Sequence, residues 1–181
     1  MKKTLNSKGM ILCALFAALT ASGALIAIPI PFSPIPISLQ ALFVFLSGAI
    51  LGSNLGALSQ LVYLLLGILG LPVFARGASG IGVVIGPTGG YLAGFVIAAY
   101  IIGFIFERKI KSTVTIDALV MFLGMAIYYI TGTIWLMRVM DLGVVKAITA
   151  GILPFLPGDI LKVIIAAIIV NKNAIKHAFI P

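Results

Sequence analysis

The sequence is poor in charged residues, which make up 9% of its 181 positions, against about 25% in soluble domains. A surface this short of charge cannot be solvated by water, so soluble globular and disordered classes are excluded. The single cysteine, Cys13, excludes a disulfide framework and a zinc site built from cysteines. The chain has no G-x-x-x-x-G-K-[ST] loop and no Ser/His/Asp or H-E-x-x-H set in its apolar runs. We therefore expect no enzyme activity, no catalytic residue, no bound metal and no ATP hydrolysis by this chain.

Hydrophobic residues dominate instead, at 62% of the chain, and the mean hydropathy is +1.27. Apolar runs between helix breakers predict an all-α integral membrane protein, a bundle of six transmembrane helices in a single membrane-embedded domain over residues 1–181. The second and third runs are short, with only Gly52-Ser53-Asn54 as a tight turn between them. The predicted spans are Gly9–Ile28, Ser38–Leu51, Leu55–Leu71, Pro87–Phe106, Ile116–Met137 and Ala150–Val170.

The basic residues predict the orientation in the membrane. Of the 12 Lys and Arg, eight lie in the N-terminal tail, the segment after the fourth span and the C-terminal tail. Three lie on the other side of the predicted membrane, at Arg76, Arg138 and Lys146. Because cytoplasmic loops carry the excess of Lys and Arg, we expect both termini in the cytoplasm. The positive charge is therefore assigned to membrane orientation and not to nucleic-acid binding.

Two segments on the outer side are unsuited to spanning a membrane. Residues 29–36 contain four prolines and cannot be helical, so we expect an extended strap. Residues 76–91 are apolar and glycine-rich, and irregular backbone of this kind must pack inside protein or line a cavity. We therefore expect a ligand cavity near the outer face.

Asp159 and Lys162 are the strongest candidates for ligand contact. An ionisable side chain within a span costs about 2.5–3.5 kcal/mol on insertion scales, so it calls for a reason. The two are three residues apart, on one face of the last helix and in its outer half. Lys162 could neutralise an anionic ligand and Asp159 could accept hydrogen bonds from ligand N–H groups. A purely structural ion pair is the alternative.

Further candidates lie on or beside the two outer segments. Arg76 has the planar fork that suits a carboxylate, although it could equally snorkel to lipid headgroups. Phe74 and Trp135 could stack on a ligand ring, but an interfacial aromatic belt is the simpler explanation for both. The remaining candidate ligand-binding residues are Gln40, Ser33, Phe32, Thr88, Gly89 and Tyr91.

Small residues recur every four positions in two places. Ala14, Ala18 and Ser22 form a smooth stripe on the first predicted helix. Gly48, Gly52 and Gly56 form a second one across the predicted turn. Such stripes allow close helix–helix approach, and on the first helix the partner could lie within the chain or in another subunit.

Several separated motifs together resemble those of the BioY family, the biotin-specific substrate-binding (S) components of energy-coupling factor (ECF) transporters. The resemblance covers nearly the whole chain. It rests on the proline-rich strap, on residues 71–77, on Gly86-Pro87-Thr88-Gly89-Gly90-Tyr91 and on Pro157-Gly158-Asp159-x-x-Lys162.

The resemblance implies a six-helix protein of the bacterial plasma membrane that captures biotin with high affinity on the outer face for import. It also implies partners, namely a transmembrane coupling subunit and two cytoplasmic ATPases, beside membrane lipid. By the same resemblance, Ala14 and Ala18 dock the coupling subunit, and Asp159 and Lys162 contact the ligand. No cofactor is implied beyond biotin as the transported ligand.

One position departs from the family pattern. Arg76 stands where a small or neutral residue is expected in many relatives, so another vitamin stays open as the substrate. A self-sufficient carrier is a second candidate function. A membrane enzyme is a third, although the spans hold no evident catalytic groups.

Overall fold

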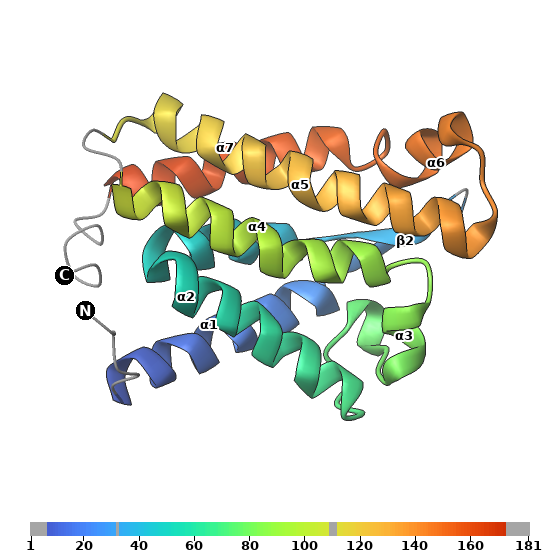
Figure 1. Cartoon of the computed structure of the whole chain (residues 1–181), viewed down its shortest axis with the longest axis horizontal. Coiled ribbons are helices and arrows are strands. Elements are labelled where there is room, and N and C mark those ends of the chain that lie inside the picture. The colour runs from blue at the N-terminus through green and yellow to red at the C-terminus, as the bar shows by residue number, and fades with distance from the viewer. Residues whose placement is uncertain (1–6, 32, 109–111, 173–181) are drawn as a thin grey trace.

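Long apolar helices run back and forth along one axis of the molecule (Figure 1). The computed structural model describes residues 7–31, 33–108 and 112–172. Four of its helices are long and apolar enough to cross a membrane, and α6 with α7 makes a fifth candidate span, bent by 52°. The protein is thus a multi-pass membrane protein. The helices are α1 (Ser7–Leu25), α2 (Gln40–Ile68), α4 (Gly89–Arg108), α5 (Val114–Met140), α6 (Val144–Gly151) and α7 (Leu156–Lys172).

The predicted break between the second and third apolar runs lies inside helix α2. Only Gly52 has non-helical backbone angles there. Gly52 has φ 82° and ψ −175°, far from helical values. A Cβ on Gly56 would lie 3.0 Å from the Cα of Gly48, whereas eight residues of straight helix span about 12 Å. The two arms of α2 therefore fold back on each other at Gly52, as the teal ribbon shows (Figure 1).

The last predicted span, Ala150–Val170, is wrong as one continuous helix. Residues 152–155 separate α6 from α7. Pro154 lies in this break, and proline lacks the N–H that would continue a helix. Pro157 is the second residue of α7, where a missing N–H costs nothing.

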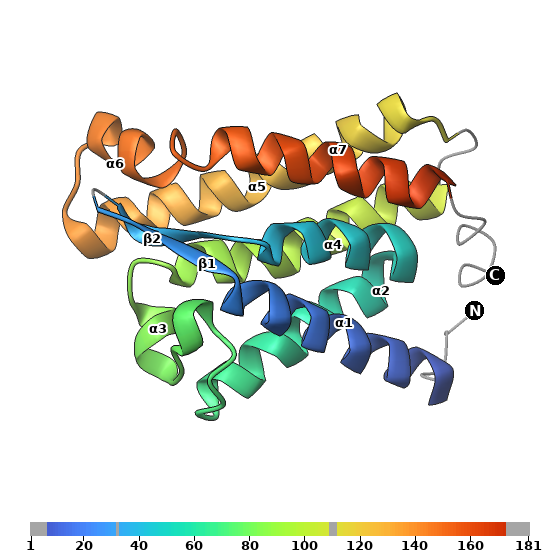
Figure 2. The same ribbon diagram turned by 180° about the vertical axis from the view of Figure 1, so that it is seen from behind.

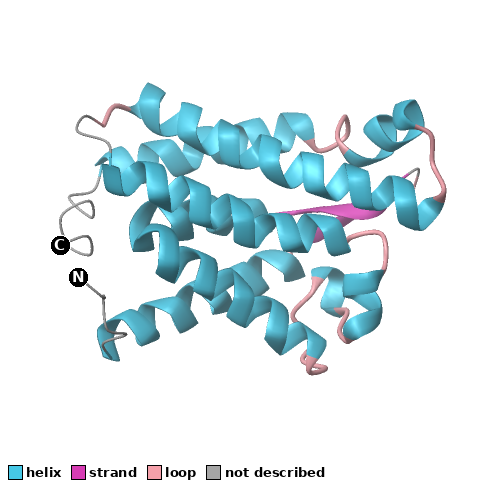
Figure 3. Cartoon of the chain, viewed as in Figure 1, coloured by secondary structure: helices cyan, strands magenta, loops and turns pink. Residues whose placement is uncertain are grey.

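The prediction of a purely helical protein also needs correction. The proline-rich strap forms an antiparallel pair, β1 (Ala27–Ile30) and β2 (Ser33–Ser38), with Ala27 opposite Ser38 and Ile28 opposite Ile37. Within the described residues it is the one sheet (Figure 3). Extended backbone was expected from the prolines, but pairing depends on the chain reversing within the strap. Figure 2 shows this ribbon running from the end of α1 toward α6 and back to α2.

As predicted, the glycine-rich segment does not cross the bundle. It contains two short helical turns that the hydrophobic periodicity did not reveal. These are η1 (Ala75–Gly77) and α3 (Ile81–Ile85). The segment is tied to the second arm of α2, because the N–H of Gly80 donates to the carbonyl of Gly67 at 2.7 Å. It therefore packs onto the end of the bundle where α2 finishes (Figure 1).

Helix α4 packs against both α2 and α5. Small residues make this packing close, since a Cβ on Gly48 would lie 2.6 Å from the carbonyl oxygen of Ala99. At Gly103 a Cβ would overlap the backbone of Gly52 and Ser53. The glycine stripe at residues 48–56 thus serves contacts within the chain.

The described ends of the chain lie together. The start of α1, the carboxyl end of α4 and the carboxyl end of α7 are all at one end of the bundle, and α3 and α6 are at the other (Figure 1). Lys2, Lys3, Lys109, Lys111 and Lys176, which enter the charge argument, lie outside the described residues.

Candidate ligand-binding site

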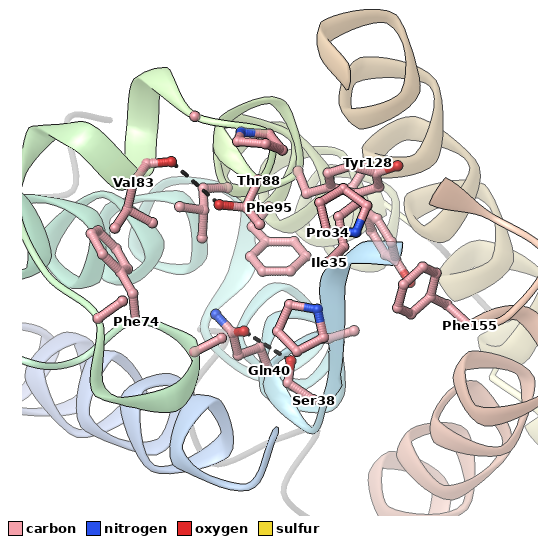
Figure 4. A pocket seen from close by; sticks show the side chains of 18 of the residues that line it. Pro34, Ile35, Ser38, Gln40, Phe74, Val83, Thr88, Phe95, Tyr128 and Phe155 are labelled. Carbon is pink, nitrogen blue, oxygen red and sulfur yellow. Dashed lines mark hydrogen bonds between the residues drawn. The ribbon is translucent and has the colours of Figure 1, made fainter. Parts of the chain in front are cut away.

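A cavity of about 500 Å³ opens among β2, the start of α2, the glycine-rich segment, α4, α5 and α7. Its lining is mostly apolar, with Pro34, Ile35, Phe95 and Phe155 on its walls (Figure 4). A volume of this size and an apolar wall with few polar groups are typical of small-molecule sites. The elements around the cavity place it toward the end of the bundle that carries α3 and α6 (Figure 1).

Six of the predicted ligand-binding residues line this one cavity, although they come from four separate parts of the sequence. They are Gln40, Arg76, Thr88, Tyr91, Asp159 and Lys162. Tyr91 contributes its ring, because its hydroxyl donates to the carbonyl of Gly151 at 2.9 Å. The Thr88 hydroxyl likewise donates to a backbone carbonyl, that of Val83.

The structure does not bring Ser33 and Gly89 to the cavity wall. The Ser33 hydroxyl donates to the carbonyl of Ala150 at 2.7 Å, and so fastens the strap to α6. Gly89 is buried against the backbone of Val84, where a Cβ would not fit. Both residues therefore have structural roles, and Phe32 lies outside the described residues.

Asp159 and Lys162 form a buried ion pair at the start of α7, with exposed fractions of 4% and 6%. Lys162 Nζ lies 2.5 Å from Asp159 Oδ1. The hydroxyls of Tyr128 and Tyr129 on α5 donate to Asp159 Oδ2 at 2.5 and 2.7 Å. A buried carboxylate needs such partners, and here both oxygens have them.

Two cations line the cavity, Arg76 at its rim and Lys162 beside Asp159. An ammonium has three N–H donors, and Asp159 uses one of them. Lys162 lines the cavity, so its other donors can reach a ligand oxygen. Asp159 holds Lys162 in place and also lines the cavity, so its predicted acceptance of ligand N–H groups stays a prediction.

Gln40 lies at the first turn of α2 with its amide held on both sides. Ser38 Oγ donates to Oε1 at 2.8 Å, and Nε2 donates to the Tyr63 hydroxyl at 2.6 Å. Arg76 has φ 63°, a left-handed conformation that non-glycine residues rarely adopt, and lies at the exposed rim of the glycine-rich segment.

Aromatic residues of the cavity were largely missed by the sequence analysis. Phe74 is 1% exposed and lines the cavity, so assigning it to an interfacial belt is wrong. Trp135 does not line the cavity, but its Nε1 donates to the carbonyl of Gly86 and holds that turn. Tyr128 and Tyr129 were detectable, because hydroxyls in an apolar span need partners just as Asp159 does.

The whole chain has known relatives. The model of the BioY family matches residues 1–179. A "Probable biotin transporter BioY" of Pyrococcus horikoshii is 42% identical over 168 residues, covering 93% of this chain and 97% of the relative. A "Biotin transporter BioY" of Thermotoga maritima is 40% identical over 160 residues, covering 88% and 92%.

A solved structure has the same fold. It is described as the S-component for biotin from an ECF-type ABC transporter, and it superposes with a TM-score of 0.88 over 100% of both chains at 26% identity. Family model, relatives and fold agree along the full length. The chain belongs to the BioY family.

Proposed function

We propose that this protein is the biotin-binding S component of an ECF-type transporter and captures biotin for import. The observation that carries the proposal is a cavity of about 500 Å³ holding a buried ion pair, in a chain of the BioY family. Biotin combines a ureido ring, a sulfur ring, an aliphatic tail and a carboxylate. A mostly apolar wall with a few fixed polar groups suits such a molecule.

Lys162 is the proposed contact for an oxygen of biotin, with Asp159, Tyr128 and Tyr129 keeping its ammonium in position. The pair is buried, so a charge-assisted hydrogen bond from Lys162 is stronger there than at a surface. Gln40, Tyr91 and Thr88 complete the wall, and Arg76 at the rim is the proposed contact for the ligand tail. No cofactor other than the transported biotin enters the proposal.

The proposal includes six membrane crossings with both termini in the cytoplasm. The fold-back of α2 at Gly52 supports two crossings by that helix, the first of them short. The described chain ends lie at the end of the bundle away from α3 and α6 (Figure 1). With the ends inside, the cavity faces the extracellular side, and the whole chain acts as a single substrate-binding domain.

The chain needs an energy source, and we place it in a transmembrane coupling subunit with two cytoplasmic ATPases. The stripe on α1 supports this, because Ala14 and Ala18 are both exposed. The large apolar side chains beside them, Ile11 at 68% and Leu15 at 50%, are also exposed. A smooth apolar helix face of this kind accepts a neighbouring transmembrane helix at short distance.

Equilibrium binding of biotin to the purified protein in detergent tests the proposal, with thiamine and riboflavin as competitors. We expect biotin alone to bind, and Lys162→Ala to weaken binding at least tenfold. Asp159→Asn should weaken it as well, because Lys162 loses its anchor. Lys146→Ala and Asp141→Asn make the same changes at exposed positions and serve as matched controls.

Two results of the binding experiment would contradict parts of the proposal. If the folded wild-type protein does not bind biotin, the substrate is wrong. If biotin binds and neither variant changes its affinity, Asp159 and Lys162 form a purely structural pair and the ligand contact lies elsewhere on the wall.

A further inference from the structure

Behind the cavity wall, a chain of hydrogen bonds fixes the orientation of one amide. Gln40 lines the cavity and is 5% exposed. Its Oε1 accepts from Ser38 Oγ at 2.8 Å, and its Nε2 donates to the Tyr63 hydroxyl at 2.6 Å (Figure 4 shows the bond to Ser38). The terminal torsion of a glutamine is otherwise broad, so these two bonds fix the plane of the amide group.

Tyr63 is itself held in place. It lies on the second arm of α2, is 1% exposed and does not line the cavity. Its ring meets Phe74 edge to face, with centroids 5.6 Å apart and planes at 89°. The Phe74 ring in turn lies directly on Gly67, where a Cβ would overlap it. The ring and the hydroxyl of Tyr63 therefore connect Phe74, just before η1, to Gln40 at the start of α2.

We propose that Tyr63 is a positioning residue for ligand recognition and acts through Gln40. An amide nitrogen carries two hydrogens, and Tyr63 accepts one of them. Gln40 lines the cavity, so its second amide hydrogen can donate to an oxygen of the ligand. Ser38, which also lines the cavity, holds Oε1 from the other side. This inference rests on the function proposed above and adds a residue outside the cavity to its specificity.

The test is a double-mutant cycle on Tyr63 and Gln40, with biotin affinity as the measurement. Tyr63→Phe keeps the ring against Phe74 and removes only the hydroxyl that holds Gln40. We expect biotin affinity to fall about 3- to 10-fold, the size of one hydrogen bond. Tyr100→Phe makes the same change on α4, away from the cavity and 43% exposed, and should leave affinity unchanged.

The comparison is repeated in a Gln40→Leu background, because residues that act through one contact are not additive. There Tyr63→Phe should have no further effect on affinity. Should Gln40→Leu fail to fold, Ser38→Ala replaces it, and the combined loss with Tyr63→Phe should be smaller than the product of the two single losses.

Equal losses in both backgrounds would overturn the inference, because Tyr63 would then stabilise the wall in general. No loss in the wild-type background would overturn it too. Failure of the proposed function shows itself separately, in the absence of biotin binding by the unaltered protein.

Discussion

At the scale of single residues, the cavity is governed by how polar groups are satisfied in apolar surroundings. Asp159 is 4% exposed and receives hydrogen bonds from Lys162, Tyr128 and Tyr129. Leaving a buried charge unpaired costs far more than its pairing contributes. The three donors therefore act as a unit that satisfies both oxygens of the buried carboxylate.

This unit predicts the effect of removing one tyrosine hydroxyl. Tyr128→Phe and Tyr129→Phe should each lower the stability by about 1.5–3 kcal/mol, the range for hydrogen bonds to charged groups. Thermal unfolding in detergent measures the change. Tyr100→Phe, at an exposed position, should leave the melting temperature where it is. If the melting temperatures of both variants are unchanged, the two hydroxyls do not stabilise the buried Asp159.

At the scale of elements, the fold-back of α2 sets the shape of the bundle. It puts Gln40, at the start of the first arm, beside Tyr63 on the second arm. It also places Ser53 against the end of α4, where the Ser53 N–H donates to Glu107 Oε1 at 2.8 Å and Ser53 Oγ donates to Oε2 at 3.0 Å. The fold-back thus positions Gln40 in the cavity wall. At the opposite end of the bundle it joins α2 to α4 through Ser53 and Glu107.

Gly52 is the residue on which the fold-back depends. It has φ 82°, which disfavours any L side chain, and an added Cβ would overlap the Glu107 carboxylate. We expect Gly52→Ala to lower the stability by at least about 1–2 kcal/mol. Gly158→Ala is the matched control, because nothing lies within 4 Å of its added Cβ. Thermal unfolding of the two variants measures the difference, and equal melting temperatures would argue against the role of Gly52.

At the scale of the whole molecule, the described chain ends and the cavity lie toward opposite ends of the bundle (Figure 1). Apolar side chains remain exposed along the helices, for example Leu119 at 62% and Ile130 at 58%. In water such a surface would aggregate, and in a bilayer it contacts lipid. If the end that carries the described chain ends faces the cytoplasm, the cavity faces the extracellular side.

Two single-cysteine variants in a Cys13→Ala background test that orientation. Ser79→Cys lies in the glycine-rich segment and Ser7→Cys at the start of α1, and both serines are exposed. A membrane-impermeant maleimide added to whole cells should label Ser79→Cys only. Ser7→Cys should react once the membrane is opened. The reverse pattern would place the cavity on the cytoplasmic side.

Much of the helical framework was predictable from the sequence. Helices α1, α4 and α5 begin and end within three residues of the predicted runs, because apolar stretches in lipid must satisfy their backbone internally. The break at residues 52–54 was predicted from its turn-forming composition. The break at residues 152–155 was missed, because Pro154 lies between apolar residues that kept the hydropathy high.

The candidate site was predictable in part. Charged and polar residues in apolar spans stand out one by one, which is why Asp159, Lys162 and Gln40 were identified. Their partners were less visible, because Tyr63, Tyr128 and Tyr129 are ordinary components of membrane helices. A sequence shows that a buried polar group needs a partner, but contacts between distant segments identify which one it has.

The sequence by itself determined that this is a multi-pass membrane protein with a few costly polar groups, because hydropathy and charge depend on residue type alone. Only the tertiary structure decided that six of the predicted ligand-binding residues line one cavity and that Ser33 and Gly89 do not. It also decided that Asp159 is bound by Lys162 and by two tyrosines of α5. These outcomes depend on the fold-back at Gly52 and on helix packing, which bring side chains far apart in sequence within hydrogen-bond distance.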